Sequence, residues 1–514
     1  MRSSVLQGKK TVRRLTIVLW PLACLFGVSL AAYLGPNRTT AAGQGEVASA
    51  PRRFVDIPVD VLEDKIRGGM LGQIIGNLNG GPHEGKYFET PGTVERYTPA
   101  LPDGAWTDDD TDIEWVYVTA MARTDTVYLP PETIVKLWRS HVNRGIWMSN
   151  RYARQLMDLG IDPPLTGRIL INPWAEYNVS GHFVCETFGL IAPGMPQTAS
   201  RIGLHYTHVS VDAEPSQSTQ LFDSMIAVAF FENDIEKILL AGLAAVDPAS
   251  GLYRLVKDVH ALWKENPQDW RTTRQKIRSR YERYGPREAR DWAGTELNTA
   301  AIVAALLYGK GDFVETLRLA FNFGWDADCN AATAGTVVGV MKGRRWMNSQ
   351  EWVIRDIYRN TRRDAMPLDE TISSFENKVI AVAKRIILQA GGRENTASGR
   401  KVLSIPVEKP AVVELLPNPP DRRNELRAAL LPQIARWIHG SERDRARAAY
   451  LAIALDEYQR YQKERPAQWA QALDALRKYP NVIREIFAHI APSAKRIQDS
   501  ARAAGLEPLP ATTK

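Results

Sequence analysis

Four aspartates lie between Trp106 and Trp115 in the stretch DGAWTDDDTDIEWVY, residues 103–117. Carboxylates this close repel one another, so a folded protein keeps them in water or gathers them around a cation. Their alternate spacing matches the start of a calcium loop, but Ile113 stands where that loop needs glycine and Thr119 where it needs glutamate. Two interpretations remain: acids that bind another cation, or acids that cap the helix predicted to begin here.

A second acidic pair, Asp326 and Asp328, lies in FGWDADCNAATAGTVVGVMKG at residues 323–343. The small residues that follow predict a helix that another backbone can approach closely at Gly335 and Gly339. Two carboxylates at its start would project together, and the helix dipole would favour their ionised form. Helix capping is again the alternative interpretation.

The third stretch is GNLNGGPHEGKYFE at residues 76–89, a glycine-rich loop that carries Glu84 and by itself indicates only a turn. Together the three stretches offer oxygen ligands at helix ends. Such hard donors, without a histidine or thiolate cluster, suit Mg²⁺ or Mn²⁺ rather than zinc. Two such ions can position a sugar diol and lower the pKa of a water molecule.

In this order, the three stretches resemble the motifs of the ADP-ribosylglycohydrolase family. The family pattern is similar to G-D-A-x-G-x-P-x-E, then W-T-D-D-T, then G-G-D-T-D-T-x-A-A-x-x-G-A-x-x-G. The corresponding segments here are GNLNGGPHE (76–84), WTDDD (106–110) and GWDADCNAATAGTVVG (324–339). The resemblance covers roughly residues 58 to 345. It implies an all-α globule with a two-metal centre at one end.

The resemblance also implies roles for single residues. Glu84, Asp108 and Asp109 would be catalytic, with Glu84 placed to hold or deprotonate the attacking water. Two Mg²⁺ (or Mn²⁺) ions would be held by the residues at the ligand positions, which are Thr107, Asp108, Asp109, Asp326, Asp328 and Cys329.

Three further residues are candidates for substrate contact. Trp325 replaces a glycine of the family pattern, and its indole would either stack on a base or sugar or pack in the core. Glu186 and His182 belong to SGHFVCETFG, residues 180–189, and are candidates to face the cleft.

The chain departs from the family pattern at several positions. Asn77 replaces an aspartate, and Asp110 replaces a threonine unless Thr111 supplies it through a shift of one residue. Cys329 replaces a threonine, and because a thiol is a poor ligand for a hard cation, one metal site is expected to be weaker or differently built. Asp110 is expected to lie behind the ligands, and Asp112 to cap the helix.

Helical periodicity dominates the chain, so we expect an all-α fold: a compact multi-helix domain with a small helical C-terminal appendix. Gly68, Gly72 and Gly76 lie four residues apart on one predicted helix face, where another backbone should pack very close. Helices are predicted over residues 58–77, 112–124, 131–143, 196–206, 216–231, 234–246, 252–263, 298–308, 312–322, 329–342 and 371–390.

Composition shifts divide the chain into four regions: 1–50, 51–390, 391–420 and 421–514. The second is the catalytic domain, the third a linker rich in glycine and proline, and the fourth the helical appendix with a disordered tail. The first carries basic residues before an apolar run from Leu15 to Leu34. It predicts an export signal or a single-pass signal-anchor, followed by a linker. The positive-inside rule then places the body outside the cytoplasm, periplasmic or secreted.

Composition narrows the function classes. The net charge of +7 over 514 residues is modest, and no basic and aromatic residues interleave as in nucleic-acid-binding modules, so no nucleic-acid partner is expected. Three cysteines make no disulfide framework. The expected partner is a small-molecule or glycan substrate, and the sequence does not indicate an oligomeric state.

The leading hypothesis is an exported Mg²⁺-dependent hydrolase that cleaves a glycosidic bond at C1 of a ribose-like sugar, of the ADP-ribosylglycohydrolase type. ADP-ribosylated proteins are mainly cytoplasmic, whereas this chain is predicted to leave the cytoplasm. A first alternative is therefore an extracellular or cell-wall glycoside on the same metal-dependent fold. A second is a non-catalytic ligand-binding protein on a degenerate version of the fold.

Overall fold

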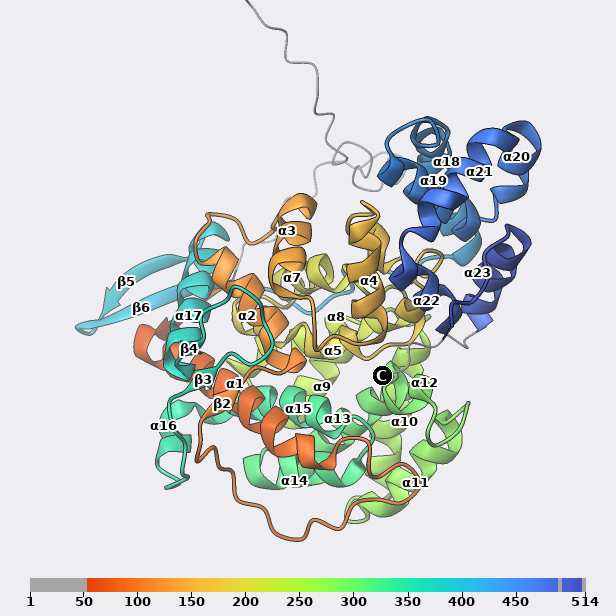
Figure 1. The fold of residues 1–514 in the computed structure, drawn as a ribbon. Helices are drawn as coiled ribbons and strands as arrows, with labels where there is room; N and C mark the ends of the chain where they lie inside the picture. The colour runs from red at the N-terminus through yellow and green to blue at the C-terminus, as the bar shows by residue number, and fades with distance from the viewer. Residues whose placement is uncertain (1–52, 489–491, 511–514) are drawn as a thin grey trace, which may run out of the picture. The chain divides into compact units, whose positions relative to one another are not determined.

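The computed structural model describes residues 53–488 and 492–510, and most of them are helical (Figure 1). This confirms the expected all-α class. The predicted export signal or anchor at residues 1–50 and the end of the predicted tail lie outside the described residues. Within the described residues, no helix is both long and apolar enough to cross a membrane.

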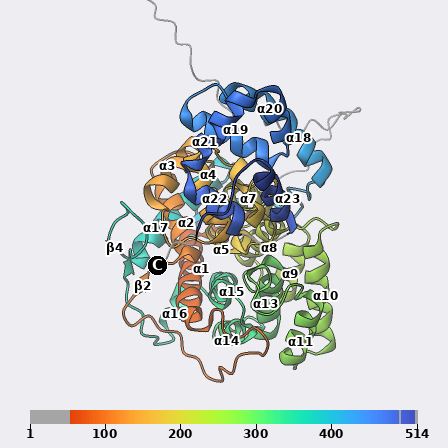
Figure 2. The same cartoon turned by 45° about the vertical axis from the view of Figure 1, so that its right-hand side comes forward.

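The helices α1 (Val59–Gly80) and α15 (Ala327–Lys342), far apart in the sequence, pack antiparallel at close range (Figures 1 and 2). A Cβ atom added at Gly72 would lie 2.1 Å from the carbonyl oxygen of Gly335, and one at Gly68 would lie 2.4 Å from that of Gly339. The predicted backbone contact is confirmed. Because the pair is antiparallel, the end of α1 lies beside the start of α15, where Asp328 is found.

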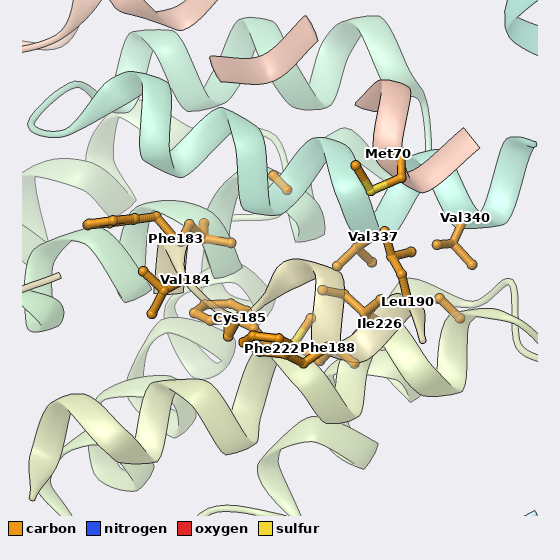
Figure 3. Packing of buried hydrophobic residues seen from close by; sticks show 14 of the residues in the cluster. Met70, Phe183, Val184, Cys185, Phe188, Leu190, Phe222, Ile226, Val337 and Val340 are labelled. Carbon is orange, nitrogen blue, oxygen red and sulfur yellow. The ribbon is translucent and has the colours of Figure 1, made fainter. Parts of the chain in front are cut away.

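Apolar side chains from several helices surround this pair. Figure 3 shows Met70 of α1 and Val337 of α15 near Leu190 of α6 (Glu186–Leu190) and Ile226 of α8 (Glu214–Ala229), all of them buried. The longer helices that complete this core are α2 (Asp109–Met121), α3 (Pro131–His141), α7 (Pro196–Thr207), α9 (Ile235–Leu243), α10 (Gly251–Glu265), α13 (Thr295–Gly309), α14 (Phe313–Phe323) and α17 (Ile372–Gln389).

Among the longer helices, two were not predicted from the periodicity, α4 (Met148–Asp158) and α11 (Trp270–Tyr281). Their buried faces include polar side chains, Ser149 and Asn150 in α4 and Thr273 and Arg274 in α11. A polar residue on the buried face breaks the apolar pattern from which a helix is recognised. Each of these two helices contributes a residue at or behind the candidate site.

Two small sheets accompany the helices. In the first, β1 (Arg53–Pro58) pairs antiparallel with β6 (Arg400–Val407), which also pairs with β5 (Arg393–Ala397). Residues 391–420, predicted as a linker, therefore contain a hairpin rather than only irregular chain. Its strand β6 buries Val402, Leu403 and Ile405, and β1 pairs with it along one edge.

The second sheet joins β2 (Ala105–Trp106), β3 (Tyr358–Arg359) and β4 (Asp369–Glu370). The strands β2 and β3 are parallel, and the backbone N–H of Thr107 donates to the carbonyl of Arg359 at 2.9 Å. The segment 360–363 therefore lies beside the start of α2.

The C-terminal helices form a second apolar cluster with α4. From α4 it contains Tyr152 and Leu156, and from the short 3₁₀ helix η4 (Pro173–Glu176) it contains Trp174. Figures 1 and 2 show α22 next to α4. These C-terminal helices are α18 (Pro419–Trp437), α19 (Glu442–Ala454), α20 (Tyr458–Glu464), α21 (Pro466–Arg477), α22 (Pro480–Ala488) and α23 (Pro492–Ala503).

Candidate active site

A cavity of about 520 Å³ opens where the end of α1 meets the starts of α2 and α15. Six carboxylates line it, and they come from all three acidic stretches of the sequence: Glu84, Asp108, Asp109, Asp110, Asp326 and Asp328. The antiparallel packing of α1 on α15 explains why two of these stretches lie together, because it places the loop that follows α1 beside the acids at the start of α15.

The acids at the helix starts do not act as caps. Asp108 is the N-cap residue of α2 and Asp326 that of α15, yet neither side chain makes a capping hydrogen bond. An N-cap carboxylate ordinarily accepts from a backbone N–H of the first turn. Here both carboxylates turn toward the cavity instead, which favours the cation-binding interpretation over helix capping.

The carboxylates fall into two groups that share one residue. Ligand oxygens of Glu84, Asp326 and Asp328 all lie within 4.8 Å of one another, and so do those of Asp108, Asp110 and Asp328. The buried Oδ1 of Asp328 has no hydrogen-bond partner among the described residues. A buried, unpaired carboxylate oxygen in an all-oxygen donor set fits a hard divalent cation such as Mg²⁺ or Mn²⁺.

Asp110 differs from the expectation that it lies behind the ligands, because it belongs to the second group. Its Oδ2 accepts from the amide of Asn77 at 2.6 Å, and the same amide lies 3.3 Å from Asp108. The hydroxyl of Thr111 is directed elsewhere, 2.7 Å from that of Tyr358. Thr111 therefore does not take the place that a shift of one residue would give it.

Arg362 is a charged neighbour that the sequence did not indicate. Its guanidinium pairs with Asp108 at 2.7 Å and with Asp109 at 3.1 Å. The β2–β3 pairing brings it there, and Thr107 helps to hold it, because the hydroxyl of Thr107 accepts from the backbone N–H of Thr361 at 2.8 Å. Thr107 is buried in this contact and does not line the cavity.

Asp112, expected to cap the helix, instead forms a fully buried ion pair with Arg363 at 2.6 Å. Arg363 also donates to the carbonyl of Gly145 at 3.0 Å. The pair therefore ties the first turn of α2 to the loop before α4, and Asp112 stands outside the cavity.

Burial and mutual repulsion dominate the electrostatics of the cluster. Desolvation, followed by the negative charges of Glu84 and Asp108, raises the pKa of Asp326 to about 7. Burial first, and then neighbouring carboxylates, also raise the pKa of Asp110 and Asp328 well above their usual range. The helix dipole was expected to keep these acids ionised, but in the cation-free protein its contribution is outweighed. A bound cation would shift the cluster back to its ionised form.

Glu84 differs from the other acids in its exposure to solvent. Desolvation of its carboxyl group and the charge of Asp108 raise the pKa of Glu84, while Arg362 acts in the opposite direction. A carboxylate with a raised pKa that is still reached by water is suited to accept a proton near neutral pH.

Trp325, a candidate for substrate stacking, is fully buried and does not line the cavity. Its ring packs on the guanidinium of Arg274 at 4.6 Å. Arg274 also donates to the carbonyls of Phe323 at 2.8 Å and Phe88 at 3.1 Å. This buried arginine therefore ties the loop beyond Glu84 to the start of α15.

His182, Glu186 and Cys329 are likewise buried and lie behind the cavity lining. The Nε2 of His182 lies 2.9 Å from the hydroxyl of Thr299, and burial lowers the pKa of His182 to about 3. Glu186 accepts from the hydroxyl of Thr333 at 2.6 Å, and burial raises its pKa. Burial raises the pKa of the Cys329 thiol as well, which keeps it protonated.

The rest of the lining contains four aromatic side chains that the sequence did not indicate. It includes Trp147, Phe183, Trp174 and Trp292, together with Arg151 of α4. Ser180 and Phe183 lie in the stretch 180–189, so that stretch does reach the cavity, through side chains other than His182 and Glu186. Trp147 is the N-cap of α4, Trp174 lies in η4 and Trp292 ends the short helix α12 (Ala289–Trp292), so no spacing in the sequence links them.

A helical protein with an acidic cavity of this kind has the features of a glycohydrolase, which cleaves sugar bonds with carboxylates. The chain belongs to the ADP-ribosylglycohydrolase family, whose model matches residues 58–374. The matched region contains all six cavity carboxylates and Arg362, whereas α18–α23 lie beyond it. A comparison with curated proteins gives no match to the chain.

Proposed function

We propose that the protein hydrolyses a glycosidic bond at C1 of a ribose-like sugar, with two Mg²⁺ or Mn²⁺ ions held by the acidic cluster. The observation that supports this most directly is the pair of carboxylate groups that share Asp328. The membership of a glycohydrolase family supports the reaction class. The same cluster argues against the non-catalytic alternative, since a degenerate site has no reason to keep this many carboxylates together against their mutual repulsion.

Each residue has a role in this reaction. When bound, the ions would supply positive charge that orients vicinal sugar hydroxyls and acidifies a water molecule. Asp108, Asp110 and Asp328 would hold one ion, and Glu84, Asp326 and Asp328 the other. Glu84 accepts a proton from the water that attacks C1, and the leaving group departs with a proton from solvent. Arg362 pairs with Asp108 and Asp109, and its charge opposes the rise in the pKa of Asp109.

We propose that this reaction takes place outside the cytoplasm. The proposal rests on the basic N-terminus and the apolar run from Leu15 to Leu34, which lie outside the described residues. The chain would then be periplasmic or secreted, or anchored by its N-terminal segment. Fractionation of cells that express a tagged protein tests this, and a soluble cytoplasmic pool of the full-length chain would refute it.

The test of the metal site compares Asp328→Asn with Asp103→Asn. Both remove one carboxylate, but Asp103 is exposed and does not line the cavity. We expect the wild type and Asp103→Asn to bind Mn²⁺ in calorimetry, and Asp328→Asn to lose binding at both positions because both groups share this residue. Failure of the wild type to bind Mn²⁺ or Mg²⁺, or unchanged binding by Asp328→Asn, would contradict the proposal.

The test of the reaction follows the release of free sugar. ADP-ribose release from peptides modified on arginine or serine is compared with sugar release from a library of glycosides, at saturating Mg²⁺. Activity on either set that disappears in Glu84→Gln supports the reaction, and the set that responds identifies the leaving group. No release from either set by the metal-loaded wild type would argue against an enzyme.

A further inference from the structure

We propose that the cavity takes an uncharged glycoside whose sugar rings stack on tryptophan, and that the C-terminal helices enforce this selectivity by cancelling the charge of Arg151. This inference rests on the proposed function and names the substrate class of the same site. It is carried by the aromatic part of the lining, by the charges of the cavity, and by one ion pair between α4 and α22.

The aromatic residues of the lining provide apolar ring faces in the same cavity as the acids. Trp147 at the start of α4 lines the cavity and is 59% exposed. No protein group among the described residues covers most of its apolar ring. The next residue, Met148, has a φ of 43°, a conformation that a residue with a side chain rarely adopts. An exposed tryptophan on a strained backbone is typical of a place kept for a ligand.

Two kinds of ligand stack on tryptophan, the C–H face of a sugar and the face of a nucleobase. The charges of the cavity distinguish them, because a nucleotide sugar also brings a pyrophosphate. Among the described residues that line the cavity, the basic side chains are Arg151 and Arg362, against six carboxylates. Arg362 is already shared by Asp108 and Asp109, so it has no charge to offer a phosphate.

Arg151 is the remaining candidate for a phosphate group, and the C-terminal helices occupy it. Both oxygens of Glu485 in α22 contact its guanidinium, one through Nε and the other through Nη2 at 3.2 Å. The side chain of Glu485 is only 7% exposed, so this is a fixed partner rather than a mobile surface charge. A bidentate carboxylate is the same kind of ligand as a phosphate and takes the positions that a phosphate would need.

The C-terminal helices also fix the rest of this wall. The hydroxyl of Tyr450 in α19 lies 2.7 Å from that of Tyr152, the residue after Arg151. Trp174, which lines the cavity, is packed in the same apolar cluster as these helices. Since α18–α23 lie beyond the family match, this selectivity would come from a part of the chain that the family model does not cover.

The test compares ligands that differ by a phosphate group. Probes are methyl β-ribofuranoside, its 5-phosphate and ADP-ribose, titrated into the full-length protein with Mg²⁺ and followed by tryptophan fluorescence. The variants are Trp147→Ala, Glu485→Gln, Arg151→Gln with Glu485→Gln, and the control Glu457→Gln. The control removes the carboxylate of another ion pair in the C-terminal helices, Arg427 with Glu457. The two pairs are matched in exposure: the side chains of Arg427 and Glu457 are 41% and 8% exposed, and those of Arg151 and Glu485 are 38% and 7% exposed.

We expect the wild type to bind the neutral riboside more tightly than its 5-phosphate, with a fluorescence change that Trp147→Ala removes. Glu485→Gln should increase the affinity for the two phosphate-containing probes by about tenfold or more, since it frees a charged donor. The double variant should lose this gain, and Glu457→Gln should behave as the wild type.

The inference would be overturned if the wild type bound ADP-ribose more tightly than the neutral riboside, or if the riboside gave no signal that depends on Trp147. It would also be overturned if Glu485→Gln gained no affinity for the phosphate-containing probes relative to Glu457→Gln. The outcome is separate from the proposed function, because binding is measured without catalysis. A protein that hydrolyses ADP-ribosyl bonds would keep the proposed function and refute only the substrate class.

Discussion

Asn77 and Asp110 show how single residues can preserve the charge of a site when both depart from the family pattern. The pattern has an aspartate at the first position and a threonine at the second, and this chain has an amide and an aspartate there. The Nδ2 of Asn77 and the Oδ2 of Asp110 lie 2.6 Å apart. Compared with the family pattern, the carboxylate is therefore on α2 instead of α1, at a position that is hydrogen-bonded to the original one. The number of acids around the cluster is unchanged, which explains why neither departure by itself indicates a lost metal site.

This exchange predicts a rescue. Asp110→Asn should weaken Mn²⁺ binding, because one carboxylate of the second group is lost. Adding Asn77→Asp should restore affinity to within about tenfold of the wild type, since the carboxylate returns at the neighbouring position. Calorimetric titration of the two single variants and the double variant checks this. A double variant no better than Asp110→Asn would show that the two positions are independent.

Arg362 gives a second prediction for a single residue. Its positive charge lies 2.7 Å from Asp108, a member of the second group, so it opposes the approach of a cation. Arg362→Gln should therefore increase Mn²⁺ affinity, while loss of the arginine charge raises the pKa of Asp109 further and makes binding more sensitive to acid. Titrations at two pH values measure both effects. If affinity falls at every pH, Arg362 acts mainly by positioning Asp108.

At the scale of the secondary-structure elements, the contact between α1 and α15 determines where the acids meet. The contact leaves no room for a side chain at Gly72, because a Cβ there would lie 2.1 Å from a backbone carbonyl of α15. Backbone atoms cannot move aside as a flexible side chain can, so any larger residue must push the two helices apart. Glu84 follows α1 and Asp328 begins α15, and a shift between the helices would separate them.

Gly72→Ala should therefore reduce both stability and metal binding. We expect a loss of about 1–3 kcal/mol in the free energy of unfolding, typical of overpacking, together with weaker Mn²⁺ binding. The matched control is Gly81→Ala, one residue beyond α1, where an added Cβ meets nothing within 4 Å. This control should stay within about 0.5 kcal/mol of the wild type. Urea unfolding of both variants gives the comparison, and equal stabilities would show that the helices can adjust.

For the whole molecule, features formed by neighbouring residues could be predicted from the sequence. Contacts between residues far apart in the sequence could not. The acidic stretches and the glycine spacing were visible, because each is a run of neighbouring residues. Arg362 reaches Asp108 from 254 positions away in the sequence, and Glu485 reaches Arg151 from 334 positions away. Ion pairs of this kind follow from tertiary packing and leave no local signature. The sequence left open whether Trp325 stacks on a substrate or packs in the core for the same reason, since its burial against Arg274 follows from tertiary packing.

The acidic cluster should also make the free energy of unfolding of the whole molecule depend on pH. The folded pKa of Asp326 is about 7, against about 3.9 in an unfolded chain. Between these values the folded state binds more protons than the unfolded state, so this group makes the free energy of unfolding fall as pH rises from about 4 to about 7. Asp110 and Asp328, with raised pKa values of the same cause, act in the same direction. Binding of Mg²⁺ to the ionised cluster would oppose the loss, by mass action.

We therefore expect the metal-free protein to lose thermal stability across this pH range relative to Asp326→Asn, and saturating Mg²⁺ to remove the difference near neutral pH. The comparison with Asp326→Asn is needed because other groups titrate too. His182, whose pKa is lowered by burial, makes the protein more stable as pH rises over part of the same range, and this contribution is common to both proteins. Calorimetric melting in chelator and in Mg²⁺ gives the four curves. Parallel pH profiles for the two metal-free proteins would mean that Asp326 ionises in the folded state as it does in the unfolded chain, and that the carboxylates are not held together under strain.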